Sequence, residues 1–130
     1  MNRKELLIVD DDVMILHMFE EAFTKAGYAV RTAESAEEAL DILKQHRFHV
    51  MFLDLKLPGM NGIELCRHIK ADIPEAMIFA VTAYASIFEL SDCFEAGFDD
   101  YFTKPVNLET LFKTAQNAFN QIDQMGKNTE

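Results

Sequence analysis

The feature that most constrains the fold is the alternation of five short apolar runs with five segments of helical hydrophobic spacing. Such alternation is typical of βαβ units, in which helices connect the parallel strands of one sheet. The runs that we predict as strands are residues 6–10, 28–32, 49–54, 76–82 and 99–103. Because the connections between parallel strands are right-handed crossovers, we expect one α/β domain with helices on both faces of a five-stranded sheet.

The segments between the runs carry apolar residues at the i, i+3 and i+4 spacing of amphipathic helices. The second segment opens with Ser35 and Glu38, a pairing typical of a capping box. The first and fourth are expected to end at Gly27 and Gly97, because glycine commonly follows the last turn of a helix. The predicted helices cover residues 15–26, 35–43, 62–71, 87–96 and 108–122.

Size and charge narrow the classes of function. A chain of 130 residues is the size of one domain, and we assign 1–125 to that domain and 126–130 to a short polar tail. Its 22 acidic and 12 basic residues give a net charge of −10, which argues against direct binding to nucleic acid or to an anionic membrane. No apolar run has the length of a membrane span or signal peptide, so we expect a cytoplasmic location.

Polar side chains follow four of the five predicted strands, at the point where each strand ends. The first run ends in Asp10 and Asp11, the third in Asp54 and the fourth in Thr82, and the fifth is followed by Lys104. Taken singly, each has an ordinary structural explanation, such as an acid that caps the next helix. Because the carboxyl ends of parallel strands meet at one edge of the sheet, we expect these side chains to form one site.

The predicted site has the chemistry of phosphoryl transfer. Neighbouring carboxylates repel one another, and the hard oxygens of Asp10, Asp11 and Asp54 suit Mg²⁺, which bridges carboxylates to phosphates. With their charge neutralised, Asp54 can attack phosphorus and form an acyl phosphate. The Lys104 ammonium and the Thr82 hydroxyl are suited to stabilise charge on the transferred oxygens.

The sequence resembles the receiver domain of bacterial response regulators over residues 4–124. Four motifs carry the resemblance in the family's order: LLIVDDD at 6–12, FLDLKLPGMNG at 52–62, AVTAYA at 80–85 and YFTKP at 101–105. The resemblance implies the flavodoxin-like, CheY-like (βα)5 three-layer fold with strand order 2-1-3-4-5, and a cis peptide between Lys104 and Pro105. Departures from the family pattern are Asn61, where many receivers have Asp, and Val106, where Phe is usual.

Carried over by position, the resemblance assigns the metal site and the acceptor. Asp54 would be the phosphorylated aspartate. Asp10 and Asp11 would bind Mg²⁺, or Mn²⁺ as a substitute, together with Asp54 and the backbone carbonyl of Lys56. The phosphoryl group would come from a sensor histidine kinase or a His-phosphotransfer domain, in a two-component or phosphorelay pathway.

The resemblance also implies a switch. Thr82 and Lys104 would pair with the phosphoryl group, and Tyr101 would then turn inward and reshape the surface formed by the fourth helix, the fifth strand and the fifth helix. Lys56 and Tyr84 stand where receivers vary with dephosphorylation rate, and these positions are similar to those of the single-domain receiver of the sporulation phosphorelay. We expect them to shield the phosphoryl group from water and to slow its loss.

We expect the protein to be a signalling receiver that catalyses only its own aspartyl phosphorylation and dephosphorylation. We expect no effector domain within these residues, so the signal would pass to a separate target protein. A pseudo-receiver that binds partners without phosphorylation is the alternative, although such a domain has usually lost one of the site residues, all of which are present here. A haloacid dehalogenase type of phosphatase would require an acid where the chain has Lys56.

Overall fold

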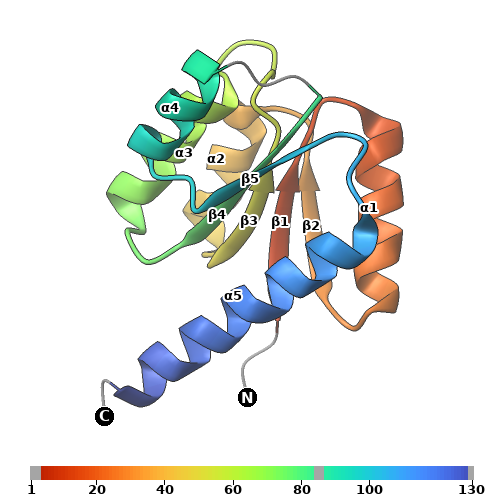
Figure 1. Cartoon of the computed structure of the whole chain (residues 1–130), viewed down its shortest axis with the longest axis vertical. Coiled ribbons are helices and arrows are strands. Elements are labelled where there is room, and N and C mark those ends of the chain that lie inside the picture. Colours follow the sequence, from red (N-terminus) through yellow and green to blue (C-terminus); the bar gives the residue numbers. More distant parts are fainter. Residues whose placement is uncertain (1–3, 84–86, 129–130) are drawn as a thin grey trace.

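Strands and helices alternate along the whole computed structural model, which describes residues 4–83 and 87–128, with side chains described for 4–83 and 90–125 (Figure 1). The elements are β1 Glu5–Val9, α1 Val13–Lys25, β2 Ala29–Ala33, α2 Ala36–Gln45, β3 Val50–Leu53, α3 Gly62–Asp72, β4 Met77–Thr82, α4 Ile87–Ala96, β5 Asp100–Thr103 and α5 Leu108–Asn128. Each strand end lies within one residue of its predicted position, which confirms the alternation inferred from the sequence.

The strands form one parallel sheet in the order β2-β1-β3-β4-β5, as the resemblance implied. The register places Val9 beside Leu53 and Leu53 beside Ala80, and it pairs Thr82 with Thr103 at the far side. The carboxyl ends of the central strands are therefore nearly level. Residues that follow β1 and β3 reach the same edge of the sheet as the last residue of β4.

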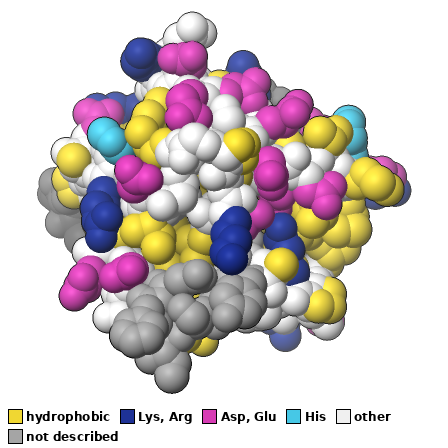
Figure 2. Space-filling view, turned by 90° about the horizontal axis from the view of Figure 1, so that it is seen from above, with side chains coloured by type: hydrophobic (Ala, Val, Ile, Leu, Met, Phe, Trp, Pro, Cys, Tyr) yellow, Lys and Arg dark blue, Asp and Glu magenta, His cyan; other side chains and the backbone are white. Residues whose placement is uncertain are grey.

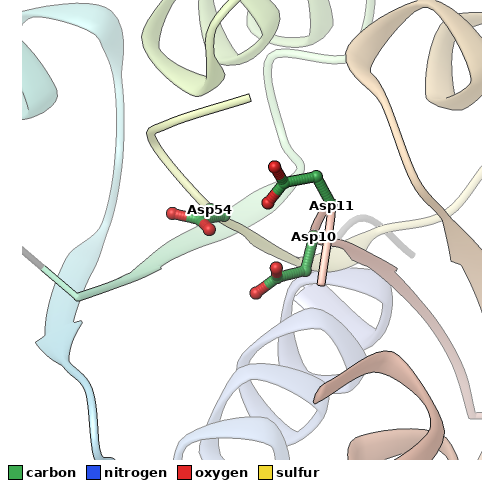
Figure 3. A group of neighbouring side chains, drawn as sticks. All are labelled: Asp10, Asp11 and Asp54. Atoms are coloured by element: carbon green, nitrogen blue, oxygen red, sulfur yellow. The ribbon is translucent and has the colours of Figure 1, made fainter. Parts of the chain in front are cut away.

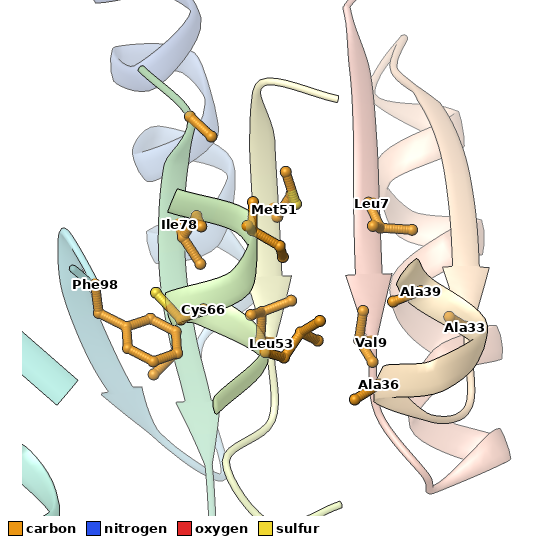
Figure 4. Packing of buried hydrophobic residues seen from close by; sticks show 14 of the residues in the cluster. Leu7, Val9, Ala33, Ala36, Ala39, Met51, Leu53, Cys66, Ile78 and Phe98 are labelled. Carbon is orange, nitrogen blue, oxygen red and sulfur yellow. The ribbon is translucent and has the colours of Figure 1, made fainter. Parts of the chain in front are cut away.

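Alternate residues of each strand face two hydrophobic clusters on opposite sides of the sheet. Leu7 and Val9 pack into the cluster beneath α2, α3 and α4, part of which Figure 4 shows. Leu6 and Ile8 point the other way, into the cluster beneath α1 and α5. The same alternation holds along β3 and β4, so both faces of the sheet are apolar and covered by helices.

Aromatic rings fill the α1 and α5 side of the core. Phe23 of α1 is fully buried, and its ring centroid lies 5.6 Å from that of Phe52 on β3 and 5.1 Å from that of Phe112 on α5. Its ring is also edge-on to Tyr28, at 5.7 Å. One side chain thus joins the sheet to both helices of this layer.

The helix starts show one difference from the sequence prediction. Ser35 Oγ accepts from the N–H of Glu38 at 3.1 Å, as a capping box requires. The Glu38 carboxylate accepts from the N–H of Glu34 at 2.6 Å instead of from Ser35, so only half of the expected box forms at α2. A complete capping box occurs at α3, between Asn61 and Glu64.

The last helix extends further than the sequence suggested. The predicted boundary at 125 falls inside α5, which continues to Asn128, so residues 126–128 are helical. Among the described residues, no helix is both long enough and apolar enough to cross a lipid bilayer.

Replacement of Phe23 by Ala is expected to lower the free energy of unfolding by about 3–5 kcal/mol, because it removes a fully buried ring and leaves a cavity between two helices and the sheet. Met14 lies on the same helix with 81% of its surface exposed. The matched change Met14→Ala should alter the stability by less than about 0.5 kcal/mol. Urea denaturation of both variants measures the difference, and equal losses would contradict this description of the core.

Candidate functional site

Three carboxylates meet at the carboxyl edge of the sheet (Figure 3). One oxygen each of Asp10, Asp11 and Asp54 lies within 4.8 Å of the others. The backbone holds the two buried members: the Asp10 N–H donates to Ala33 O at 3.1 Å, and the Asp54 N–H donates to Val9 O at 2.9 Å. These bonds continue the sheet ladder one residue beyond the strands, so the acids are carried by its most rigid part.

Lys104 provides the positive charge at this cluster. Its ammonium donates to Asp10 Oδ2 at 2.6 Å and to Asp54 Oδ2 at 3.2 Å, and only 14% of its side chain is exposed. The Lys104 N–H donates to Thr82 O at 2.7 Å, which ties the residue to the end of β4. The peptide bond between Lys104 and Pro105 is cis, as the resemblance implied.

The electrostatics of the cluster are dominated by burial. Burial raises the pKa of the Asp10 carboxyl above 3.8, against the hydrogen bonds from Lys104 and from the Asp12 N–H, and the charge of Asp54 adds to the increase. Burial lowers the pKa of Lys104, but its bonds to Asp10 and the charges of Asp10 and Asp54 outweigh this, so that pKa is raised overall. The Lys104 ammonium thus bonds to two of the three carboxylates, Asp10 and Asp54.

The donor set fits a hard divalent cation. Carboxylate oxygens from three residues, converging from two neighbouring strands, are the ligands that Mg²⁺ prefers. The Lys56 N–H donates to Asp54 Oδ1 at 3.3 Å, which brings the backbone of the expected fourth ligand to the site. Figure 2 looks down on this end of the molecule and shows acidic side chains close to a basic one near the centre of the face.

The loop between β3 and α3, residues 54–62, folds back tightly against the Asp54 backbone. A Cβ at position 62 would lie 2.1 Å from Asp54 O and 2.8 Å from Leu55 Cα, so only glycine fits there. The Gly62 N–H donates to Leu55 O at 2.9 Å and closes the loop. Leu55 and Leu57 are buried and anchor it to the core, with Lys56 exposed between them.

The remaining predicted site residues lie along β4 and β5. Thr82 is the last residue of β4 and is 1% exposed. Tyr101 is half-buried on the adjacent β5, and its ring is edge-on to Phe94 of α4 at a centroid distance of 6.3 Å. Phe94 is 55% exposed, which places an apolar ring on the surface beside Tyr101. Tyr84, expected to modulate the rate, lies outside the described residues.

Sequence reasoning missed two contacts that shape the loop between β3 and α3. Asn61, which the sequence marks only as a departure from the family pattern, caps α3 together with Glu64. The Asn-x-x-Glu spacing was a local signal that could have revealed this. The second contact joins Glu37 of α2 to the N–H of Met60 at 3.1 Å. Because 23 residues separate Glu37 from Met60 in sequence, no local sequence pattern predicts this contact.

Comparison with known proteins gives one consistent result. The model of the response regulator receiver domain matches residues 6–116. The chain is 37% identical over 125 residues to a cyclic di-GMP phosphodiesterase of Thermotoga maritima, covering 95% of this chain and 33% of that protein. It is 34% identical over 106 residues to the response regulator MprA of Mycobacterium sp. (strain KMS), covering 82% of this chain and 46% of that protein. The chain therefore spans less than half the length of these curated relatives.

Solved structures agree with the fold. A CheY-like receiver domain protein of Methanospirillum hungatei JF-1 has 33% identity and a TM-score of 0.84, with 92% of this chain and 99% of that chain covered. The BeF3-activated receiver domain of DrrB from Thermotoga maritima has 34% identity and a TM-score of 0.84, with the same coverage of both chains. The likeness covers nearly all of this chain.

The substitution Asp10→Asn is expected to stabilise the cation-free protein at neutral pH. A raised pKa means that the folded state holds the proton more tightly than the unfolded state, so ionised Asp10 costs stability above its folded pKa and nothing well below 3.8. We expect a gain in stability at pH 7 in the presence of a chelator, because Lys104 keeps its bond to Asp54 when the charge of Asp10 is removed. The gain should shrink as the pH falls through the raised pKa toward 3.8.

Urea denaturation at several pH values, with and without Mg²⁺, measures this effect. The cation should stabilise the wild type much more than the variant, because binding to the folded state alone adds to its stability. A variant that is less stable than the wild type at pH 7 without the cation would contradict the assignment of Asp10 as an insufficiently compensated buried charge.

Proposed function

The chain belongs to the response regulator receiver family, and from this membership we propose that it accepts a phosphoryl group on Asp54 in a Mg²⁺-dependent reaction. The donor is a phosphohistidine of a sensor histidine kinase or of a His-phosphotransfer domain. The observation that carries the proposal is the ammonium of Lys104, which bridges Asp54 and Asp10 within a cluster of three carboxylates. This is the charge arrangement that an acceptor aspartate requires.

In the proposed reaction, an Asp54 oxygen attacks phosphorus while the bond from phosphorus to the histidine nitrogen breaks. The electron pair of that bond stays on the nitrogen, the ring takes up one proton from solvent, and the products are an aspartyl phosphate and a neutral imidazole. Asp10, Asp11, Asp54 and the Lys56 carbonyl would hold Mg²⁺, or Mn²⁺ in its place, which neutralises charge on the carboxylates and the phosphoryl oxygens when bound. The Lys104 ammonium already lies 3.2 Å from Asp54 Oδ2 and can pass to a phosphoryl oxygen with little movement.

The output proposed for the phosphorylated form is a changed surface formed by α4, β5 and α5. The phosphoryl group adds negative charge that recruits Lys104 and the Thr82 hydroxyl toward Asp54. Movement at Thr82 favours an inward position of Tyr101, so the modification shifts the population between two states. Phe94, exposed and in edge contact with Tyr101, is a candidate contact for the target protein.

We propose that the domain acts as a signalling module and catalyses only its own phosphorylation and dephosphorylation. Its partners are proteins: the phosphodonor domain and a downstream target, with no direct contact to nucleic acid or membrane. The net charge of −10 supports protein partners over polyanions. Because receivers take their phosphoryl groups from cytoplasmic kinase domains, we place the reaction in the cytoplasm.

Incubation with acetyl phosphate and Mg²⁺ is expected to add one phosphoryl group to the protein, as measured by intact mass. Asp54→Ala should abolish the gain because it removes the attacking oxygen, and a chelator should suppress it in the wild type. Asp41→Ala, at an exposed carboxylate on α2 paired only with Lys44, serves as the matched control and should behave as the wild type. No gain in the wild type would favour the phosphorylation-independent pseudo-receiver.

The aspartyl phosphate is expected to decay slowly, with a half-life well beyond seconds. The long side chain of Lys56 follows the acceptor by two residues, and its N–H is bonded to Asp54, so it can screen the phosphoryl group from water. Lys56→Ala should shorten the half-life by roughly two- to tenfold through better access of water. Loss of the added mass with time after removal of acetyl phosphate measures the half-life, and a wild-type half-life of seconds would refute the expectation.

A further inference from the structure

We propose that Glu37 of α2 is a positioning residue for the acceptor site: its carboxylate fixes the 54–62 loop in the shape that presents the Lys56 backbone to Asp54 and to the bound cation. This inference rests on the proposed function, since it assigns a role within the same phosphoryl-transfer site. Glu37 touches neither the cation nor the phosphoryl group, and it acts through the loop.

The contact between Glu37 and the loop is specific in its geometry. Glu37 Oε2 accepts from the backbone N–H of Met60 at 3.1 Å, a bond between an ionised acceptor and a main-chain donor. At the neighbouring Gly59, φ is +73°, a conformation that favours glycine. A Cβ at Gly59 would lie 2.9 Å from Glu37 Oε2 and 3.4 Å from Oε1, so the carboxylate occupies the space that the missing side chain leaves. Glycine at position 59 therefore permits both the positive φ of the turn and the close approach of the Glu37 carboxylate.

The rest of the loop transmits this contact to the site. At the far end, Gly62 lies so close to Asp54 that a Cβ would be 2.1 Å from its carbonyl oxygen. Between the two points, Leu55 and Leu57 are buried on either side of Lys56, whose N–H bonds to the acceptor carboxylate at 3.3 Å. A shift of the turn at 59–60 therefore alters the path of the chain through Lys56, whose carbonyl is the expected backbone ligand.

The role of Glu37 is separable from general stabilisation of α2. Glu37 is exposed, and exposed ionic contacts contribute little to the free energy of unfolding. Glu38, in the same first turn of α2, carries the same charge but accepts from the N–H of Glu34 at 2.6 Å. Both acids interact favourably with the start of the helix. A difference in Mg²⁺ affinity between the Glu37 and Glu38 variants can therefore be attributed to the contact of Glu37 with the loop.

The test is Mg²⁺ binding to the unphosphorylated full chain, measured by titration calorimetry for the wild type, Glu37→Ala, Glu37→Gln and Glu38→Ala. We expect Glu37→Ala to weaken Mg²⁺ binding about three- to tenfold, at or below the lower end for outer-shell contacts of a metal site. Glu37→Gln keeps an oxygen that can accept from Met60 and should stay close to the wild type. Glu38→Ala should also bind as the wild type, and thermal unfolding should show similar stability for the three variants.

Each other outcome overturns the proposal. Unchanged binding by Glu37→Ala would show that the loop holds its shape without the contact. Equal weakening in the Ala and Gln variants, or in Glu38→Ala, would show that negative charge near the site, rather than the bond to Met60, sets the affinity. Weakening that follows a loss of thermal stability would assign Glu37 a general structural role.

A readout without the cation separates this inference from the proposed function. Hydrogen exchange at the Met60 amide should become faster in Glu37→Ala and stay slow in Glu37→Gln, whether or not the protein accepts a phosphoryl group. A wild type that takes no phosphoryl group from acetyl phosphate would refute the proposed function, even with this exchange pattern. A wild type that is phosphorylated, with unchanged Mg²⁺ binding and Met60 exchange in Glu37→Ala, would refute the role of Glu37 alone.

Discussion

The burial of two carboxylates beside a third, at the edge of an otherwise apolar sheet, is the constraint on which the rest of this structure depends. Asp10 and Asp54 are 2% and 7% exposed, and the ammonium of Lys104 bonds to both. Such burial is costly unless compensated, and the raised pKa of Asp10 shows that compensation is incomplete in the absence of a cation. The hydrophobic clusters on both faces supply the stability that offsets this cost, and the unbalanced negative charge favours the binding of a cation at this edge of the sheet.

The fold determines which parts of the site are rigid and which can move. The acids follow β1 and β3, two of the three strands that have a neighbour on each side in the described sheet, and backbone bonds to Ala33 and Val9 fix them there. Thr82 and Tyr101, the groups expected to move on phosphorylation, lie on β4 and β5, toward the edge of the sheet. Tyr101 is only half-buried there and packs against the exposed ring of Phe94. A fixed Asp54 next to a less constrained edge suits a receiver, because residues of β4 and β5 could move in response to charge added at Asp54 while the acids keep their places.

The sequence was most informative where structure is set by local patterns. Strand positions follow from apolar runs, and the clustering of Asp10, Asp11, Asp54 and Lys104 follows from parallel topology, which brings strand ends together whatever their separation in the chain. The half-formed box at Ser35 shows the limit of such patterns, since Glu38 has a choice of donors and bonds to Glu34 instead. The end of α5 was missed because a short run of polar residues in the sequence is equally compatible with the end of a helix and with a tail. The bond from Glu37 to Met60 depends on how α2 packs beside the loop, which no window of sequence contains.

The two glycines of the acceptor loop show how function is built from backbone as much as from side chains. Gly62 lets the chain return to within contact of the Asp54 carbonyl, and Gly59 lets the Glu37 carboxylate reach the turn. Neither residue has a group that reacts, yet any side chain at these positions would collide with the part of the site that it borders. The Lys56 N–H beside the Asp54 carboxylate is held between the buried Leu55 and Leu57, and the turn residues that follow bring the chain back to Asp54 at Gly62. Asp54 at the end of its strand is therefore bordered by a loop whose shape is set from three sides: the core, the start of α3 and the first turn of α2.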